Sequence, residues 1–184
     1  MSLGIIILVI VLVIALFCMV SYNGFVRAKN DCEEAFSTMD VYMKKRYDLI
    51  PNLVETVKGY AKHEQETLEK VIAARNFAQG ATTIEDKISG ENALTGTLKS
   101  LFAISEAYPD LKANTNFLDL QRQLKSVEED IANSRKYYNA VVKLFNNKCE
   151  MFPSNIIARI FNFAAKPMFE VDSEEERKNV KVEF

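Results

Sequence analysis

Residues 117–148 read FLDLQRQLKSVEEDIANSRKYYNAVVKLFNNK, and no proline or glycine interrupts them. Apolar side chains recur every three or four positions along this stretch, which places them on one stripe of an α-helix. The predicted helix is about 35 residues and roughly 50 Å long. The stripe consists of Phe117, Leu120, Leu124, Val127, Ile131, Ser134, Tyr138, Val141, Phe145 and Lys148. A helix of this length needs partners along its apolar side, so the stretch predicts an all-α bundle.

Three more helical segments are predicted upstream of this stretch. The first carries apolar residues from Phe25 to Tyr47 at helical spacing, and no proline lies between residues 3 and 50. Proline disfavours helical geometry in the residue before it, so DLIPNL (48–53) predicts a tight turn. A second helix then runs to Gly80, and a third covers about 84–107.

The ends of the predicted helices follow from local chemistry. Gly90 and Gly96 predict an irregular first half for the helix at 84–107. The stretch YPDLKANTNF (108–117) predicts a long connector, with Asn116 and Asp119 capping the helix that follows it. Ser154 after Pro153 is expected to cap a short C-terminal amphipathic helix. Together these segments predict an antiparallel bundle of three to four long helices plus that short helix.

The N-terminal stretch Leu3–Val20, LGIIILVIVLVIALFCMV, contains 18 residues without a charge. With the two residues that follow, it spans roughly 30 Å as a helix, which is the thickness of a bilayer's hydrocarbon core. It is predicted to be a transmembrane helix that continues into the first helix of the bundle, and membrane lipid is its expected partner. The predicted anchor residues are Leu3, Ile7, Ile10, Ile14, Phe17 and Tyr22.

Two signal-sequence alternatives fit this stretch less well. A cleaved signal peptide has a basic start and a small-x-small cleavage site, and neither is present. A lipoprotein signal has a small residue before its cysteine, whereas Phe17 precedes Cys18. Arg27 and Lys29 follow the apolar run and nothing basic precedes it, so the positive-inside rule predicts a single-pass protein with its bundle in the cytoplasm and its N-terminus outside.

The predicted organisation has three parts. Residues 1–22 form the transmembrane anchor, 23–169 the helical bundle, and 170–184 an acidic tail expected to be solvated or disordered. The short helix before the tail is rich in large apolar side chains. One interpretation is that it closes the open end of the bundle, and the other is that it contacts the membrane surface or a neighbouring subunit. The residues concerned are Ile156, Ile157, Ile160, Phe161 and Phe163.

Composition and motifs exclude several classes of function. A chain with 23 basic and 25 acidic residues has no net positive field to attract nucleic acid. Three scattered cysteines indicate neither a disulfide framework nor a zinc ribbon. One histidine, His63, cannot supply a site that needs two, and its HE pair does not continue as HExxH. No phosphate-binding loop or nucleophile–base pair is found, so no catalytic residue, metal or cofactor is predicted. The Glu128–Glu129 pair is interpreted as a solvated helix face.

Polar residues close to the predicted apolar stripes suggest a buried polar network. Either Asp40 or Asp48 is expected to pair with Arg135 or Arg46 across facing helices and so fix their register. Asn139 lies one turn after Arg135 and completes the set. The alternative is that these side chains project into solvent from the edge of the stripe.

Several blocks of the sequence together resemble the LemA family. They are YNGFV (22–26), DVYMKKRYDLIPNLVETVKGYAKHE (40–64), the Ala74-Arg75 pair, YPDLKANTNFLDLQRQL (108–124), IANSRKYYNAVVKLFN (131–146) and FPSN (152–155). The family often has tryptophan where this chain has Phe36. The resemblance implies a non-enzymatic bacterial protein with an N-terminal anchor in the inner (cytoplasmic) membrane and long antiparallel helices. Relatives encoded in magnetosome gene clusters point to membrane organisation, and no catalytic residues carry over.

Two hypotheses for the function follow. The first is a membrane-anchored scaffold that assembles into homo-oligomers, because long helices present edges for packing and anchoring raises the local concentration. The second is an adaptor that binds another membrane protein, such as an envelope protease, through the turns DLIPNL and YPDLKANTNF. Self-crosslinks in cells would favour the first, and a heterologous crosslink the second.

Overall fold

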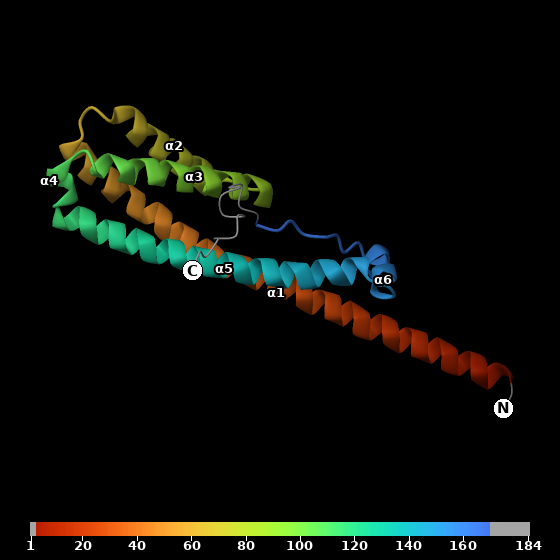
Figure 1. Ribbon diagram of the computed structural model, residues 1–184. Coiled ribbons are helices and arrows are strands. Elements are labelled where there is room, and N and C mark those ends of the chain that lie inside the picture. The colour runs from red at the N-terminus through yellow and green to blue at the C-terminus, as the bar shows by residue number, and fades with distance from the viewer. Residues whose placement is uncertain (1–2, 170–184) are drawn as a thin grey trace, which may run out of the picture. The chain divides into compact units, whose positions relative to one another are not determined.

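The computed structural model describes residues 3–169, and 86% of them are helical with no strand among them. The predicted acidic tail at 170–184 lies outside the described residues. Figure 1 shows the order of the helices along the described chain. They are α1 (Leu3–Tyr60), α2 (Gln65–Gly80), α3 (Ile84–Ser105), α4 (Pro109–Lys112), α5 (Thr115–Glu150) and α6 (Ser154–Ile160). The all-α class predicted from the apolar periodicity is therefore correct.

Helix α1 is continuous over 58 residues, from the apolar N-terminal stretch through Pro51 to Tyr60. The turn predicted at DLIPNL is wrong, because the chain leaves helical geometry only at Ala61–Glu64. A proline inside a helix removes one backbone hydrogen bond. Here a side chain from α2 replaces that bond, as described below.

Helices α2 and α3 pack side by side, and Figure 1 shows them as neighbours. Gly90 of α3 lies against Ala78 of α2, and a Cβ added at Gly90 would come 2.7 Å from the Cα of Ala78. The irregular first half predicted for this helix is wrong: Gly90 permits close contact inside a regular helix. Thr83 begins α3 as a capping residue, since its Oγ1 accepts a hydrogen bond from the Asp86 amide at 3.1 Å.

The connector predicted at 108–117 contains the short helix α4. Asn114 caps α5, because its Oδ1 accepts a hydrogen bond from the Phe117 amide at 2.9 Å. The cap was predicted at Asn116, which instead lies inside the first turn of α5. The Asn114 side chain also donates to the Tyr60 hydroxyl at 2.8 Å, which ties this connector to the end of α1.

Helix α5 buries the predicted apolar stripe with one change of register. Phe117, Leu124, Val127, Ile131, Tyr138 and Phe145 are all buried, as predicted. Val142 is buried in place of Val141, which is half-buried, and Lys148 is exposed. A straight helix has 3.6 residues per turn rather than 3.5, so a strict heptad drifts off the buried face after several turns.

The C-terminal end of α5 is capped from α6. Ser154 Oγ lies 2.8 Å from the Lys148 carbonyl and 2.9 Å from the Met151 carbonyl, and it donates toward these oxygens. The prediction that Ser154 caps the short helix α6 is therefore wrong, because its hydroxyl serves the helix before it. Helix α6 ends at Ile160, and Asn162 just after it has a φ of 56°, in the left-handed region that asparagine tolerates.

The described chain divides into two compact units, and α1 and α5 contribute to both. The anchor unit contains the described residues up to Met39 together with Ser134–Met168. The network unit contains Asp40–Asn133. The first holds the apolar N-terminal stretch and α6, and the second holds α2, α3 and α4.

Candidate functional site

The network unit buries a group of charged and polar side chains around Arg46. The Arg46 side chain is fully buried in α1, and its guanidinium donates to the carboxylates of Glu91 in α3 and Glu128 in α5. Its Nη1 also donates to Thr95 Oγ1 at 3.1 Å. Three helices therefore converge on a single cation. A buried charge needs partners of opposite sign, and the two carboxylates supply them through the Nη1 and Nη2 atoms of Arg46. Among the described residues, the buried Nε atom of Arg46 has no hydrogen-bond partner.

Tyr47 extends this network. Its hydroxyl donates to the second carboxylate oxygen of Glu91, so both oxygens of that buried carboxylate are bonded. Burial and the nearby Glu91 charge raise the pKa of Tyr47 well above its usual value of 10.0. The tyrosine therefore stays neutral and acts as a hydrogen-bond donor over the whole physiological pH range.

A second ion pair lies beside the first. Lys87 Nζ of α3 is 3.1 Å from the Asp40 carboxylate of α1 and 5.5 Å from the centre of the Tyr47 ring. Lys87 is buried, whereas Asp40 is half-buried. Two ion pairs, Arg46–Glu91 and Lys87–Asp40, therefore link α1 to α3 at positions one to two helical turns apart.

The Tyr47 backbone explains how α1 passes through Pro51. Pro51 lacks the N–H that would donate to the carbonyl of Tyr47, four residues earlier. Arg75 Nε of α2 donates to that carbonyl oxygen at 2.8 Å instead. The buried backbone acceptor is therefore satisfied from another helix, as buried carbonyls normally are. This contact joins two sequence blocks of the family resemblance, residues 40–64 and the Ala74-Arg75 pair.

The observed network differs from the predicted one. Arg46 is buried and ion-paired, but its partners are Glu91 and Glu128 rather than Asp40 or Asp48. Asp40 pairs with Lys87, and Asp48 is exposed on the far side of the stripe. The reason is that the facing helix presents its own carboxylate at the depth of Arg46.

Other predicted members of the network lie elsewhere. Arg135 and Asn139 are half-buried in α5 and belong to the anchor unit, so their share in a network stays a prediction. Glu128 was predicted to be solvated, but it accepts from Arg46 and its side chain is 35% exposed.

Helix α3 contributes charged residues to the network that were not predicted from the sequence. Its buried residues are Lys87, Gly90, Glu91, Leu94, Leu98, Leu101 and Ser105. The apolar members Leu94, Leu98 and Leu101 are spaced by four and three residues. Continuing that spacing backwards from Leu94 reaches Glu91 and then Lys87, so the periodicity contained a signal for both. Charged residues at buried stripe positions mark a paired interior site.

The network is suited to holding helices in register. Within residues 3–169, no group of three or more histidine, cysteine, aspartate or glutamate side chains is arranged as a metal-ligand cluster. The buried carboxylate of Glu91 is occupied by Arg46 and Tyr47. These residues therefore form ion pairs and hydrogen bonds that join α1, α3 and α5.

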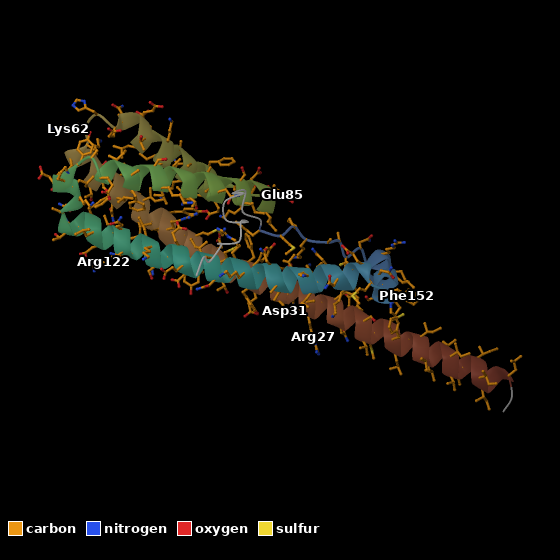
Figure 2. The ribbon with its side chains drawn as sticks, viewed as in Figure 1. Arg27, Asp31, Lys62, Glu85, Arg122 and Phe152 are labelled. Carbon is orange, nitrogen blue, oxygen red and sulfur yellow. The ribbon has the colours of Figure 1, made fainter. Side chains whose placement is uncertain are left out.

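The anchor unit presents a different kind of surface. All six predicted anchor residues are exposed, by between 39% for Tyr22 and 75% for Leu3. Figure 2 shows side chains projecting on both sides of the ribbon along this first part of α1. By length and composition, α1 is the one helix in the described part of the chain that could cross a membrane.

The residues predicted around α6 divide into two groups. Ile157 is buried and Phe163 half-buried, whereas Ile156, Ile160 and Phe161 are exposed. The inward pair fits the interpretation that the segment closes an open end of the fold. The outward three stay available for the alternative contact with a membrane or a second subunit.

A groove of about 530 Å³ lies between α3 and α5 in the network unit. Its lining combines apolar Leu98, Phe102 and Leu124 with basic side chains. The basic residues are Lys99, Arg122 and Lys125. Sequence reasoning did not find this groove, because it depends on the distance between two helices.

Several known proteins are similar to this chain. The LemA family model matches residues 35–184. Protein LemA of Metamycoplasma hominis is 28% identical over 162 residues, which cover 86% of this chain and 72% of that protein.

Magnetosome proteins are also similar to this chain. Magnetosome protein MamQ 2 of Paramagnetospirillum magneticum is 25% identical over 81% of this chain, and Magnetosome protein MamQ of Magnetospirillum gryphiswaldense is 25% identical over 77% of it. The matches cover 64% and 62% of those two proteins. The chain therefore spans less than two thirds of the length of these magnetosome relatives.

Proposed function

Because the chain belongs to the LemA family, we propose that it is a bacterial membrane-anchored scaffold that assembles with further copies of itself and has no enzymatic activity. The proposal has three parts: an anchor in the membrane, a stiff helical body, and a surface for self-association. Each part is supported by a different set of residues.

The anchor is supported by the outward-facing apolar side chains of residues 3–20. A helix satisfies its own backbone hydrogen bonds, so it can be surrounded by lipid. Arg27 and Lys29 follow this stretch, which favours a bundle on the cytoplasmic side of the inner membrane and an N-terminus outside. Anchoring confines copies to two dimensions and raises their effective concentration.

The helical body is proposed to be an antiparallel bundle. In the anchor unit, Lys148 Nζ donates to the Gly24 carbonyl at 2.9 Å, and the rings of Tyr138 and Phe36 lie 5.9 Å apart. Residues later in α1 therefore contact residues earlier in α5, which is the order expected of antiparallel helices. The pairing of Arg46 with Glu128 in the network unit follows the same order.

The observation that carries the scaffold proposal is a second apolar row on α5. Tyr137, Val141 and Leu144 follow one another at spacings of four and three residues, and Lys148 comes four residues later. Tyr137 is 59% exposed and Leu144 64% exposed, so this row is separate from the buried stripe. A row of this spacing is the seam of a coiled coil.

A groove of about 520 Å³ lies along this row in the anchor unit, between α1 and α5. Ala28 and Asp31 line it from α1, and Val141 and Leu144 line it from α5. We propose that side chains of an identical α5 from a second copy enter this groove. From Tyr137 to Lys148 the row is about 12 residues, or roughly 17 Å, long.

Crosslinking in native membranes tests the scaffold. A Leu144→Cys variant treated with a short bis-maleimide should give a band of twice the monomer mass. Lys143→Cys is the matched control, because its position is turned by about 100° on the same helix. The unsubstituted chain measures the background from its own cysteines. Equal crosslinking of both variants, or a monomeric mass at every concentration after detergent extraction, would contradict self-association through this row.

The groove between α3 and α5 favours the alternative, an adaptor for another membrane protein. Its apolar floor and three basic residues suit an acidic amphipathic segment. A photocrosslinker placed at Gln121 should then give a heterologous band that Arg122→Glu and Lys125→Glu abolish. A homodimer band that the charge reversals leave unchanged would count against the adaptor.

A further inference from the structure

Large apolar side chains gather on the outside of the α5–α6 end of the anchor unit. Phe152 is 79% exposed and Ile160 62% exposed, and Figure 2 shows Phe152 at the junction of α5 and α6. We call the exposed set the α6 patch. It consists of Met151, Phe152, Ile156, Ile160 and Phe161. Five such residues within eleven positions form a patch of the kind that marks a contact surface.

Aromatic contacts fix the α6 patch to α1 at the residue where the apolar stretch ends. The Phe161 ring lies 4.7 Å from the ring of Tyr22, and Phe163 stacks on Phe25 at 4.8 Å with an angle of 10°. The rings of Phe163 and Phe145 lie 6.4 Å apart, so the segment that follows α6 also contacts α5.

The chain reversal after α6 determines which of these side chains face inward. Asn162 adopts the left-handed conformation, and the Phe163 amide donates to the Ala158 carbonyl at 2.8 Å. This is the Schellman arrangement, which reverses the chain in a fixed direction. Ile157 and Phe163 therefore turn inward while Ile156, Ile160 and Phe161 stay outside.

Basic side chains lie at the same level of the anchor unit. Arg27 on α1 and Arg159 on α6 are exposed. Lys148 Nζ donates to the Gly24 carbonyl and lies 5.9 Å from the Phe25 ring centre. Arg27 and Lys148 line one hollow with Ser154 of α6, and Asp31 lines another with Lys148 and Phe152. Apolar side chains with basic residues beside them are typical of segments that lie in an anionic membrane surface.

We propose that the α6 patch inserts into the interfacial layer of the same bilayer that holds α1, with Arg27, Lys148 and Arg159 facing anionic lipid headgroups. The inference rests on the proposed membrane anchor. If residues 3–22 span the hydrocarbon core, Tyr22 lies at its boundary, and Phe161 in contact with Tyr22 lies there too. A bilayer is therefore already present at the α6 patch, whereas a second copy would have to be brought to it. The protein would then hold the membrane at two points.

The chain contains no tryptophan, so single tryptophan substitutions report their own surroundings without background. Four variants of the full chain serve: Ile160→Trp and Phe152→Trp in the α6 patch, Leu12→Trp in the anchor, and Phe77→Trp as the control. Phe77 is an exposed aromatic residue in α2 of the network unit. Each is reconstituted in phosphatidylcholine–phosphatidylglycerol vesicles with lipids brominated at a shallow or a deep acyl position.

The expected result is selective quenching. Shallow bromines should quench the Ile160→Trp and Phe152→Trp variants several-fold more than the Phe77→Trp variant, and deep bromines should quench Leu12→Trp. Acrylamide in water should quench Phe77→Trp most. Adding Arg159→Gln should reduce the shallow quenching of Ile160→Trp in anionic vesicles and leave it unchanged in phosphatidylcholine alone.

Three results would overturn the inference. If acrylamide quenches the α6 variants as strongly as Phe77→Trp, the α6 patch faces water. If neither acrylamide nor bromine quenches them, protein covers the patch, as a second copy would. In both cases, quenching of the Leu12→Trp variant by deep bromines would still support the proposed membrane anchor. If Leu12→Trp itself escapes bromine, the proposed function fails and the inference fails with it.

Discussion

The carbonyl of Tyr47 shows how a single residue decides where a helix ends. Pro51 cannot donate to it, and an unsatisfied buried carbonyl would favour a break in α1. Arg75 donates to this oxygen from α2, and α1 continues for nine more residues to Tyr60. The proline therefore marks a contact between two helices rather than a turn.

Replacing Arg75 should show the worth of this contact. An Arg75→Met variant should lose about 1–3 kcal/mol of unfolding free energy, because the Tyr47 carbonyl loses its donor. The same substitution should cost about 1 kcal/mol less in a Pro51→Ala background, where residue 51 regains its N–H. Thermal unfolding of the unsubstituted chain, the two single variants and the double variant, followed by circular dichroism, measures the coupling free energy between residues 75 and 51. An equal cost in both backgrounds would show that Arg75 does not replace the missing bond.

Breaking the buried ion pair should be more costly. A Glu91→Ala variant leaves the Arg46 charge buried with only the half-exposed Glu128 opposite it, and we expect a loss of about 3–5 kcal/mol. The double variant Arg46→Met, Glu91→Leu should regain most of this loss, since it removes both charges. The control is Glu129→Ala, an exposed position beside Glu128, which should change stability by less than about 0.5 kcal/mol.

The Tyr47 hydroxyl should make stability fall at alkaline pH. Its pKa is raised in the folded protein above the usual 10.0, so the unfolded chain loses this proton first as the pH rises. The folded state then binds more protons than the unfolded state, and unfolding free energy falls with pH. The slope of that fall should be shallower in Tyr47→Phe by at most about 1.4 kcal/mol per pH unit. Denaturant unfolding at a series of pH values measures it, and parallel curves above the usual tyrosine pKa would contradict the assignment.

At the scale of elements, α2 and α3 pack closely because a glycine faces an alanine. Gly90 and Ala78 are both fully enclosed, and glycine leaves room for backbone contact. The helix propensity of glycine is poor by about 1 kcal/mol, yet the close approach offsets it. Propensity alone therefore gave the wrong expectation of an irregular segment.

Two glycines in the same helix provide a matched test. Gly90→Ala should destabilise the protein by about 1–3 kcal/mol, because the new Cβ would overlap the Ala78 backbone. Gly96→Ala meets nothing within 4 Å and should stabilise it by about 0.5–1 kcal/mol through helix propensity. The unfolding midpoints of the two variants measure these changes in stability. If both variants are more stable than the unsubstituted chain, α2 and α3 can move apart at this contact without loss of stability.

At the scale of the whole molecule, the anchor and the network unit serve different needs. The apolar side chains of residues 3–20 face outward, as lipid contact requires. The network unit turns its apolar and paired charged residues inward, as a water-soluble body requires. The same helix, α1, supplies both surfaces.

The topology of the anchor can be measured at Lys62, an exposed residue in the turn after α1 that Figure 2 labels. In a Lys62→Cys variant, a membrane-impermeant maleimide should label the protein only after the membrane is permeabilised, since the basic residues favour a cytoplasmic bundle. The unsubstituted chain measures labelling of the three native cysteines. Full labelling in intact spheroplasts would place the bundle outside.

By itself the sequence determined the all-α class, the apolar N-terminal stretch and the buried face of α5, because these depend on periodicity along one helix. It also named Arg46 as one of two candidate basic residues for a buried network. The partners of Arg46, the passage of α1 through Pro51 and the use of Gly90 were decided only by the tertiary structure. Each depends on which side chain a second helix brings to a given depth, and spacing within one helix carries no information about that distance.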